Sequence, residues 1–239
     1  NFGNFNGLPN PAATTMSSPA FPRVIAVDGP AAAGKSTVAR LVAARLGGYY
    51  ISTGEMYRAL AWELRCRGVD PAADPAGTVA LLPQLKLHYE LRHGRPELLL
   101  NGELVPAEAV RAPEIAAAAS VVAAIPAVRA WLLERQRDTS QLGLIVLEGR
   151  DIGTVVFPDT PHKFFITARP ETRARRRLAQ AGETAPGATV ASVTAEIVER
   201  DRRDATRAVA PLRPAADAVI IETDTLTAEA VAARICAHL

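Results

Sequence analysis

Residues 24–46 read VIAVDGPAAAGKSTVARLVAARL, and the octet GPAAAGKS at positions 29–36 decides the fold. The octet matches the phosphate-binding loop pattern G-x-x-x-x-G-K-[ST]. The apolar run at 24–27 before it predicts a buried strand, and the apolar spacing over 37–46 predicts a helix. A strand that turns through glycines into a helix start directs backbone N–H groups and the positive end of the helix dipole at an anion.

This loop is expected to bind a nucleoside triphosphate. Lys35 can reach the β- and γ-phosphates, and the Ser36 hydroxyl can ligate Mg²⁺. The structural alternative is a chance glycine-rich turn, which the strand, loop and helix context disfavours. The expected triphosphate contacts in the loop are Gly29, Pro30, Ala31, Ala32, Ala33, Gly34, Lys35, Ser36 and Thr37.

Composition bounds the class of protein. The chain has 239 residues, of which 49% are hydrophobic, enough for one domain with an insertion. A formal net charge of only +2 does not indicate a nucleic-acid surface, and no apolar run approaches the length of a membrane span. Two cysteines, Cys66 and Cys236, cannot make a disulfide framework. We therefore expect a cytoplasmic protein that binds neither nucleic acid nor membrane.

The chain divides into a tail and one domain. Residues 1–22 are rich in Asn, Gly, Pro, Ser and Thr and lack the features of a signal peptide, so we expect a disordered tail or tag remnant. Whether residues 1–15 are native stays open. The domain covers 23–239, and alternation punctuated by Gly and Asn-Gly between 68 and 110 predicts an inserted subdomain with small antiparallel strands.

Apolar strands alternate with helices through the rest of the domain. This order predicts an α/β fold, a three-layer α/β/α core whose parallel sheet is covered on both faces. The expected strands are 24–27, 49–51, 143–147, 163–167 and 218–221. The expected helices are 37–46, the stretch after 54, 113–138 with an interruption near Pro126, 170–181, 189–206 and the stretch that Thr227 caps.

A second phosphate site is indicated by the turn after the second strand. Thr53 and Gly54 stand at a helix start, and Tyr57 and Arg58 follow one turn later. A hydroxyl and an arginine in this arrangement suit a phosphate group, through capping and charge-assisted hydrogen bonds. A plain helix cap is the alternative interpretation, and it stays open.

The segment EGRDIG at 148–153 directly follows a buried strand, where ligands of open α/β sheets bind. Glu148 is placed to hold Mg²⁺ through water, Arg150 to clamp phosphate oxygens, and Asp151 to accept a hydrogen bond from an amino group. The structural alternative is a glycine-flanked turn with an internal arginine–aspartate pair.

The helix predicted at 189–206 carries a third cluster. Arg200, Asp204 and Arg207 are spaced i, i+4 and i+7, which places them on one face. They run into the apolar segment 208–212, so the end of this face is not expected to hang free. An ordinary solvated face explains the spacing equally well.

Four segments together resemble signatures of the bacterial cytidylate kinases, a family of nucleoside monophosphate kinases: DGPAAAGKST, STGEMYR, EGRDIGTVVFPD and ERDRRDATRAVAPL. The resemblance covers nearly all of 24–239. It implies a P-loop core, a monophosphate-binding insert at 68–110 and a short lid at 181–187 over ATP. It also implies a monomer that phosphorylates CMP and dCMP with ATP and Mg²⁺ to give CDP and dCDP.

The resemblance implies roles for single residues. Lys35, Arg58 and Arg150 are expected to carry the phosphoryl transfer. The remaining assignments place Thr53, Arg58 and Arg150 at the acceptor's phosphate, Arg111, Asp151 and Arg207 around cytosine, Arg200 and Asp204 around the ribose, and Arg173 and Arg177 at the ATP phosphates. Gly54 and Tyr57 complete the set of substrate-binding residues. Glu148 is a variable position of the family, where other members carry the shorter aspartate.

The chemistry also follows from the acceptor. A nucleoside monophosphate is already anionic near neutral pH, since its second phosphate pKa is about 6, so no general base is required. Asp151 can take the amino hydrogen of cytosine, whereas uracil presents a carbonyl oxygen there, so CMP and dCMP should be preferred to UMP. The rivals are a kinase for a hydroxyl, as in shikimate kinases, a kinase for AMP, and a nucleotide-dependent switch with little turnover.

Overall fold

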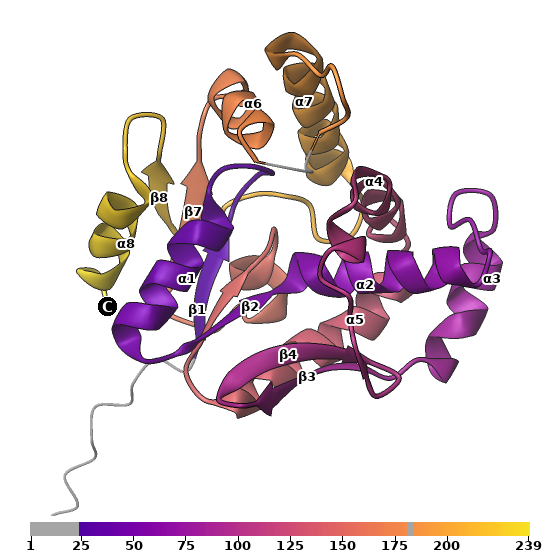
Figure 1. Ribbon diagram of the computed structural model, residues 1–239. Helices are drawn as coiled ribbons and strands as arrows, with labels where there is room; N and C mark the ends of the chain where they lie inside the picture. Colours follow the sequence, from indigo (N-terminus) through magenta and orange to yellow (C-terminus); the bar gives the residue numbers. More distant parts are fainter. Residues whose placement is uncertain (1–23, 181–183) are drawn as a thin grey trace, which may run out of the picture.

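The computed structural model describes residues 24–180 and 184–239 (Figure 1). The tail at 1–22 and residues 181–183 of the expected lid lie outside this part. A five-stranded sheet with the order β2-β6-β1-β7-β8 forms its centre, and every pairing is parallel. The strands are β1 (Val24–Asp28), β2 (Tyr49–Ser52), β6 (Ile145–Glu148), β7 (Lys163–Thr167) and β8 (Val219–Glu222). The predicted α/β fold with a parallel sheet is confirmed.

Both faces of the central strand are buried. Ile25 and Val27 of β1 pack with α1 (Lys35–Leu46) and α8 (Ala228–Cys236), while Val24 and Ala26 pack on the opposite face. A π-helical turn and α5 (Pro126–Asp138) contribute to that second face. Burial on both faces explains why β1 reads as an unbroken apolar run instead of an alternating one.

The antiparallel strands expected between 68 and 110 are present. After α3 (Pro75–Leu81), the strands β3 (Leu87–Arg92), β4 (Arg95–Leu100) and β5 (Glu103–Leu104) pair antiparallel in this order. The hairpin turn at His93 and Gly94 has positive φ at both residues, as does the turn at Asn101 and Gly102. Two-residue turns of this kind match the twist of the flanking strands.

The helices enclose a second core beside the parallel sheet. Apolar residues of α2 (Thr53–Cys66), α4 (Pro113–Val122) and α5 pack together with β3 and β4. The predicted interruption near Pro126 is confirmed, since α4 ends before it and α5 begins with it. The helices α6 (Pro170–Leu178) and α7 (Val190–Thr206) lie side by side (Figure 1).

Helix ends agree with the capping chemistry. Thr227 caps α8 as predicted, through a hydrogen bond that its side chain accepts from the backbone N–H of Ala230. Thr189 caps α7 in a reciprocal arrangement with Ser192. The helix expected over 170–181 ends earlier, at Leu178.

Within 24–180 and 184–239, no single helix is long and apolar enough to cross a membrane. The stretches Pro113–Val122 and Pro126–Leu142 meet the criteria of length and composition only together, as a pair bent by 102°. Ile115 and Leu132 of this pair are buried in the core shared with α2.

Candidate functional site

A cleft of about 980 Å³ opens at the carboxyl ends of the parallel strands. Ser52 ends β2 and lies opposite Glu148, the last residue of β6, which in turn lies opposite Val27 of β1. β1 occupies the middle of the sheet, with the strands that follow it placed on both sides. This switch point is where ligands of open α/β sheets bind.

The phosphate loop joins β1 to α1 at the cleft. A Cβ added to Gly29, whose φ is 143°, would lie 2.0 Å from the carbonyl oxygen of Ile166, so only glycine fits there. Gly34, with φ 93°, is the N-cap of α1, and within the described chain no side chain caps this helix. Its first N–H groups therefore remain available to an anion.

Most of the predicted loop contacts line the cleft. Residues 31–37 do so, whereas Gly29 and Pro30 do not, and Gly29 lies against Ile166 of β7. Lys35 is buried, and its Nζ donates a hydrogen bond to the carbonyl oxygen of Pro30 at 2.7 Å. Burial, and then the charge of Arg150, lowers the pKa of Lys35 to about 7.

Arginines from three elements converge on the same cleft. Arg58 comes from α2, Arg150 follows β6, and Arg200 belongs to α7. Burial, and then the charge of Arg150, lowers the pKa of Arg200 to about 10. The buried Nε of Arg200 has no hydrogen-bond partner in the part of the chain that the structure describes. Cations that lower one another's pKa in this way favour an anionic ligand, because its negative charge would reduce their mutual repulsion.

The first turn of α2 is held to the end of β6. The hydroxyl of Ser52 donates to Oε1 of Glu148 at 3.0 Å and accepts from the backbone N–H of Glu55 at 3.4 Å. Thr53 donates its hydroxyl to the carbonyl oxygen of Glu148 at 2.9 Å. The helix cap is therefore Ser52, and the interpretation of Thr53 as a plain cap is wrong.

One oxygen of Glu148 is available for further contacts. Its Oε2 is buried and has no hydrogen-bond partner among the residues described. Glu148 and Ser36 both line the cleft. Residues 24–180 and 184–239 contain no group of three or more His, Cys, Asp or Glu side chains that could hold a metal ion by themselves. Ser36 and Glu148 still fit Mg²⁺, which is usually bound by one or two protein ligands together with substrate phosphates and water.

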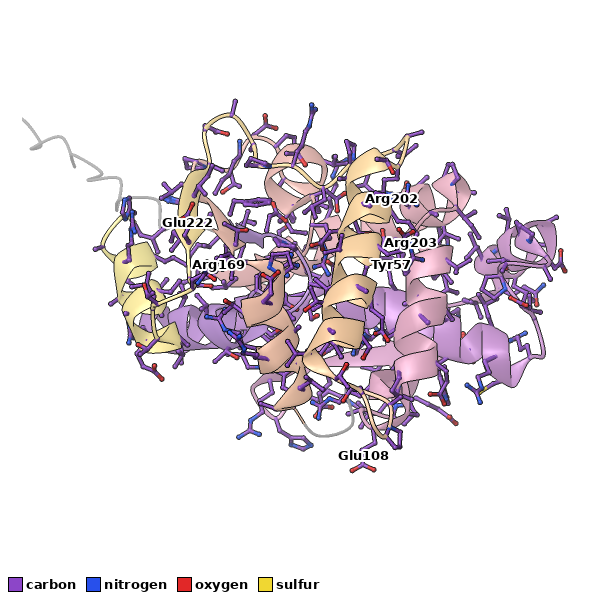
Figure 2. The ribbon with its side chains drawn as sticks, turned by 90° about the horizontal axis from the view of Figure 1, so that it is seen from above. Tyr57, Glu108, Arg169, Arg202, Arg203 and Glu222 are labelled. Carbon is purple, nitrogen blue, oxygen red and sulfur yellow. The ribbon has the colours of Figure 1, made fainter. Side chains whose placement is uncertain are left out.

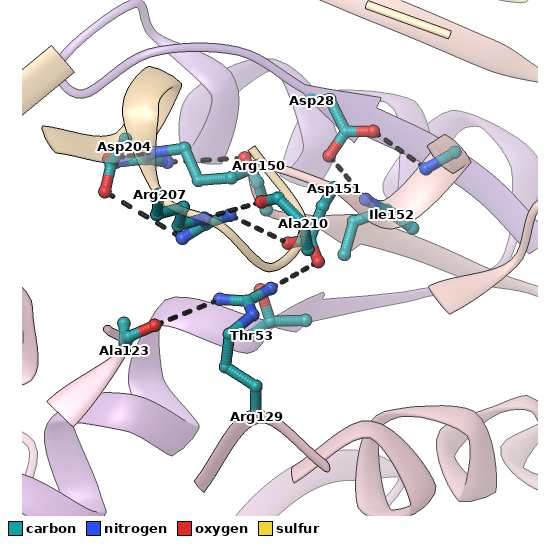
Figure 3. A network of polar contacts seen from close by, with 12 residues as sticks. Asp28, Thr53, Ala123, Arg129, Arg150, Asp151, Ile152, Asp204, Arg207 and Ala210 are labelled. Carbon is teal, nitrogen blue, oxygen red and sulfur yellow. Dashed lines mark hydrogen bonds and ion pairs between the residues drawn. The ribbon is translucent and has the colours of Figure 1, made fainter. Parts of the chain in front are cut away.

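Asp151 lies between two arginines of different helices (Figure 3). One carboxylate oxygen pairs with Arg129 of α5, and the other lies 3.6 Å from Nη2 of Arg207. Arg150 pairs instead with Asp204 of α7, at 3.3 Å. The internal pair between Arg150 and Asp151, considered as an alternative above, is therefore not formed.

Sequence reasoning missed Arg129, whereas its placement of Arg111 around the cytosine stays a prediction. Arg111 lines the cleft but is exposed. Arg129 is only 8% exposed, pairs with Asp151 and lies over the ring of Tyr57 at 5.8 Å. The available signal was a charged residue on the buried face of a helix, between Val128 and Leu132. Such residues are rarely buried without a partner.

Ser120 of α4 was also missed. Its hydroxyl oxygen is buried, lines the cleft and has no hydrogen-bond partner among the described residues. A buried hydroxyl without a partner costs free energy, so it is available to a ligand. In the sequence it stands after a run of four alanines in an apolar helix, which was its only signal.

Asp28 holds the turn that follows Asp151. Its two carboxylate oxygens accept hydrogen bonds from the backbone N–H groups of Ile152 and Gly153, both at 2.8 Å (Figure 3). These residues begin the π-helical turn Ile152–Val156. The sequence analysis assigned Asp28 no role, although an acid that ends a wholly apolar strand was a usable signal.

Burial raises the pKa of Asp28 from 3.8 to about 6. Between these two values the folded protein keeps a proton that the unfolded chain has lost, so the contribution of Asp28 to stability falls as pH rises. Two pKa units correspond to about 3 kcal/mol. We expect the substitution Asp28→Asn to remove this pH dependence. Urea unfolding of both proteins between pH 4 and 7 measures the difference, and identical pH profiles would contradict it.

The two arginines of α6 that were predicted to contact ATP lie differently with respect to the cleft. Arg177 lines the cleft, but Arg173 does not. Each of the three nitrogens of Arg173 contacts another part of the protein, in the loop, in α7 and at the end of β7. Direct contact of Arg173 with ATP phosphates stays a prediction, which these contacts do not favour. Arg176, one turn further on, lines the cleft and donates to the hydroxyl of Thr223 at 3.0 Å.

The helix α7 has one functional and one solvated face. Arg200, Asp204 and Arg207 all line the cleft, as their spacing predicts. Arg202 and Arg203, labelled on α7 in Figure 2, are exposed and pair with Glu199. The solvated face and the cleft-facing residues therefore lie on opposite sides of the same helix.

A family model described as cytidylate kinase matches residues 25–239. The chain belongs to the cytidylate kinase family. Among its relatives, the cytidylate kinase of Pelotomaculum thermopropionicum is 46% identical over 216 residues, which cover 90% of this chain and 95% of that protein. The cytidylate kinase of Stutzerimonas stutzeri is 43% identical, with 90% and 94% covered.

Other members of the cytidylate kinase family are longer. The bifunctional pantoate ligase/cytidylate kinase of Synechococcus sp. (strain WH7803) is 47% identical over 212 residues, which cover 87% of this chain but only 42% of that protein. The chain thus spans less than half the length of this relative. The resemblance inferred from the four sequence signatures is confirmed.

Proposed function

We propose that this member of the cytidylate kinase family transfers the γ-phosphoryl group of ATP to CMP and dCMP, forming CDP and dCDP. The observation that carries the proposal is the convergence of Lys35, Arg58, Arg150 and Arg200 on one cleft beside an uncapped helix start. Phosphoryl transfer needs two polyanions brought together in line and their charge neutralised, and these residues supply that environment.

The donor side is formed by the phosphate loop. Its backbone N–H groups and Lys35 hold the triphosphate, and Arg177 and Arg176 approach from α6. Ser36 and, through water, Glu148 would hold Mg²⁺, which supplies neutralisation of phosphate charge when bound. The coarser conclusion, ATP-dependent phosphoryl transfer, follows from the family.

The acceptor side lies between α2, the segment after β6 and α7. Arg58, Arg150 and Thr53 bind the acceptor's phosphate, with Gly54 and Tyr57 beside them. Arg200 and Asp204 lie where the ribose fits, and Asp151 with Arg207 where the base fits. The acceptor phosphate is itself the nucleophile, so these groups orient it and need not remove a proton.

Base selection rests on Asp151 and its arginines. A carboxylate has about four acceptor sites, so Asp151 can accept the cytosine amino hydrogen while it pairs with Arg129 and Arg207. Arginine N–H groups and the Ser120 hydroxyl are donors for N3 and O2 of the base. Arg111 borders the same side of the cleft, at its exposed rim.

The insert and lid belong to the same proposal. Leu98, Leu104 and Val105 of the 68–110 segment line the cleft, which supports a monophosphate-binding insert. The lid at 181–187 is proposed for the connection between α6 and α7. We further propose that the protein acts as a cytoplasmic monomer with nucleotides as its only partners, without nucleic acid or membrane.

The substitution Asp151→Asn should lower kcat/KM for CMP about 10-fold or more, since a hydrogen bond to a charged group contributes roughly 1.5–3 kcal/mol. The ratio of kcat/KM for CMP to that for UMP should fall as well, because the amide can donate to the uracil oxygen. The matched control is Asp159→Asn, an exposed residue of the same segment. An unchanged ratio would exclude Asp151 as the residue that reads the base.

The first experiment is ADP formation from Mg-ATP with CMP, dCMP, UMP, AMP and shikimate offered separately. Turnover with CMP and dCMP alone supports the proposal. Equal turnover with UMP would keep the kinase and remove the argument for cytosine. No turnover with any acceptor would favour the nucleotide-dependent switch.

A further inference from the structure

Arg173 of α6 joins three elements with one guanidinium group. It is 4% exposed. Its Nε donates to the carbonyl oxygen of Ala168 at 2.9 Å, and Nη1 donates to that of Ala31 at 3.1 Å. Nη2 pairs with Asp201 at 2.6 Å. The three partners belong to the end of β7, to the phosphate loop and to α7, so the planar fork fixes their relative positions.

Apolar contacts join the same elements independently. Ala32, next to Ala31 in the phosphate loop, packs against the cluster that Ala174 of α6 forms with Val193 and Ile197 of α7. Ala32 has φ 57°, a left-handed conformation that costs a non-glycine residue free energy. Such a conformation persists when its surroundings determine it, and here the α6 and α7 pair contributes to those surroundings.

The partner residue on α7, Asp201, stands between cleft-lining residues of this helix but does not itself line the cleft. Asp201 directly follows Arg200 and precedes Asp204 by three residues. Its Oδ2 pairs with Arg173, while its buried Oδ1 has no hydrogen-bond partner among the residues that the structure describes. The pairing with Arg173 therefore determines how this turn of α7 is held against the loop.

We propose that Arg173 is a positioning residue that couples the phosphate loop to α7. Triphosphate on the loop then holds Arg200 and Asp204 in the arrangement that binds the acceptor. In this role Arg173 contacts no substrate and acts through Ala31 and Asp201. That the two ligands are ATP and CMP rests on the proposed function, but the coupling of the phosphate loop to α7 through Arg173 does not.

The test measures CMP affinity with and without a non-hydrolysable ATP analogue. In the wild type, the analogue should tighten CMP binding by about 5- to 150-fold, the usual range of coupling between sites. Arg173→Lys keeps the charge but loses the fork, and Asp201→Asn removes the partner. Each should lose most of this enhancement while CMP affinity without the analogue changes less than about 2-fold. The double variant should be no worse than the more affected single variant.

A matched control is Arg175→Gln, an exposed arginine of the same helix, which should retain the full enhancement. Circular dichroism and thermal unfolding exclude variants that do not fold. Full enhancement in Arg173→Lys and Asp201→Asn, or no enhancement in the wild type, would overturn the proposal for this pair of ligands.

Hydrogen exchange separates this proposal from the proposed function. The ATP analogue alone should increase protection of the α7 amides in the wild type and in Arg175→Gln, but not in Arg173→Lys. This result supports the link even if CMP proves not to be the acceptor. Equal protection of α7 in the wild type and in Arg173→Lys would exclude the link whatever the acceptor is.

Discussion

Replacing Lys35 with alanine is expected to lower kcat for CMP phosphorylation by about 10²–10³-fold, the usual cost of losing one preorganised electrostatic contact to the transferred group. The amino group lies at the start of α1, folded against the carbonyl oxygen of Pro30 at 2.7 Å, inside the loop that holds the triphosphate. No other lysine lines the described cleft, and Arg58, Arg150 and Arg200 lie on other elements.

The Lys35→Ala variant is expected to fold. Burial lowers the pKa of Lys35 to about 7, so near neutral pH the folded state disfavours the charged amine, and its removal costs little stability. ADP release with saturating CMP measures the effect, and thermal unfolding checks the fold. The control is Lys86→Ala, an exposed lysine outside the cleft. Near-normal turnover in a folded Lys35→Ala protein would mean that the loop is not the donor site.

Replacing Arg150 with alanine is expected to lower kcat/KM for CMP by about 10²-fold or more, the second large effect. Arg150 is proposed to bind the acceptor's phosphate. After burial, its charge is the next largest cause of the lowered pKa of both Lys35 and Arg200. Without it, both the acceptor contact and part of the positive potential around the transferred group are lost.

This variant should also retain its fold. Asp204, the ion-pair partner of Arg150, keeps a second contact with Arg207 at 3.9 Å, so no carboxylate is left alone. Removing one of several mutually repelling cations offsets part of the free energy that is lost with the ion pair. The control is Arg203→Ala on the exposed face of α7. Steady-state kinetics with CMP as the varied substrate give the result, and a loss below 3-fold would exclude Arg150 from the transfer.

The predicted features that the structure confirms are those set by local chemistry. The loop turns from strand to helix through Gly29 and Gly34, which both have positive φ, and Thr227 caps α8. The strands were recognisable because burial on both faces requires continuous apolar runs. Arg200 and Asp204 share a face because helical periodicity requires it, and Arg207, which follows the end of α7, lines the same cleft.

The partners of charged side chains were decided only by the tertiary structure. Periodicity places a residue on a face but does not say which element packs against that face. The pairing of Arg129 with Asp151 and the contacts of Arg173 with Ala31 and Asp201 therefore could not be read from the sequence. Asp28 holds a turn 124 residues away in sequence.

The sequence by itself thus determined the phosphate loop, the order of strands and helices, and the family. The tertiary structure decided which arginines of the described residues line the cleft and which pair with other parts of the protein. The physical reason is that backbone conformation depends on neighbours in the chain, whereas an ion pair depends on distance in space.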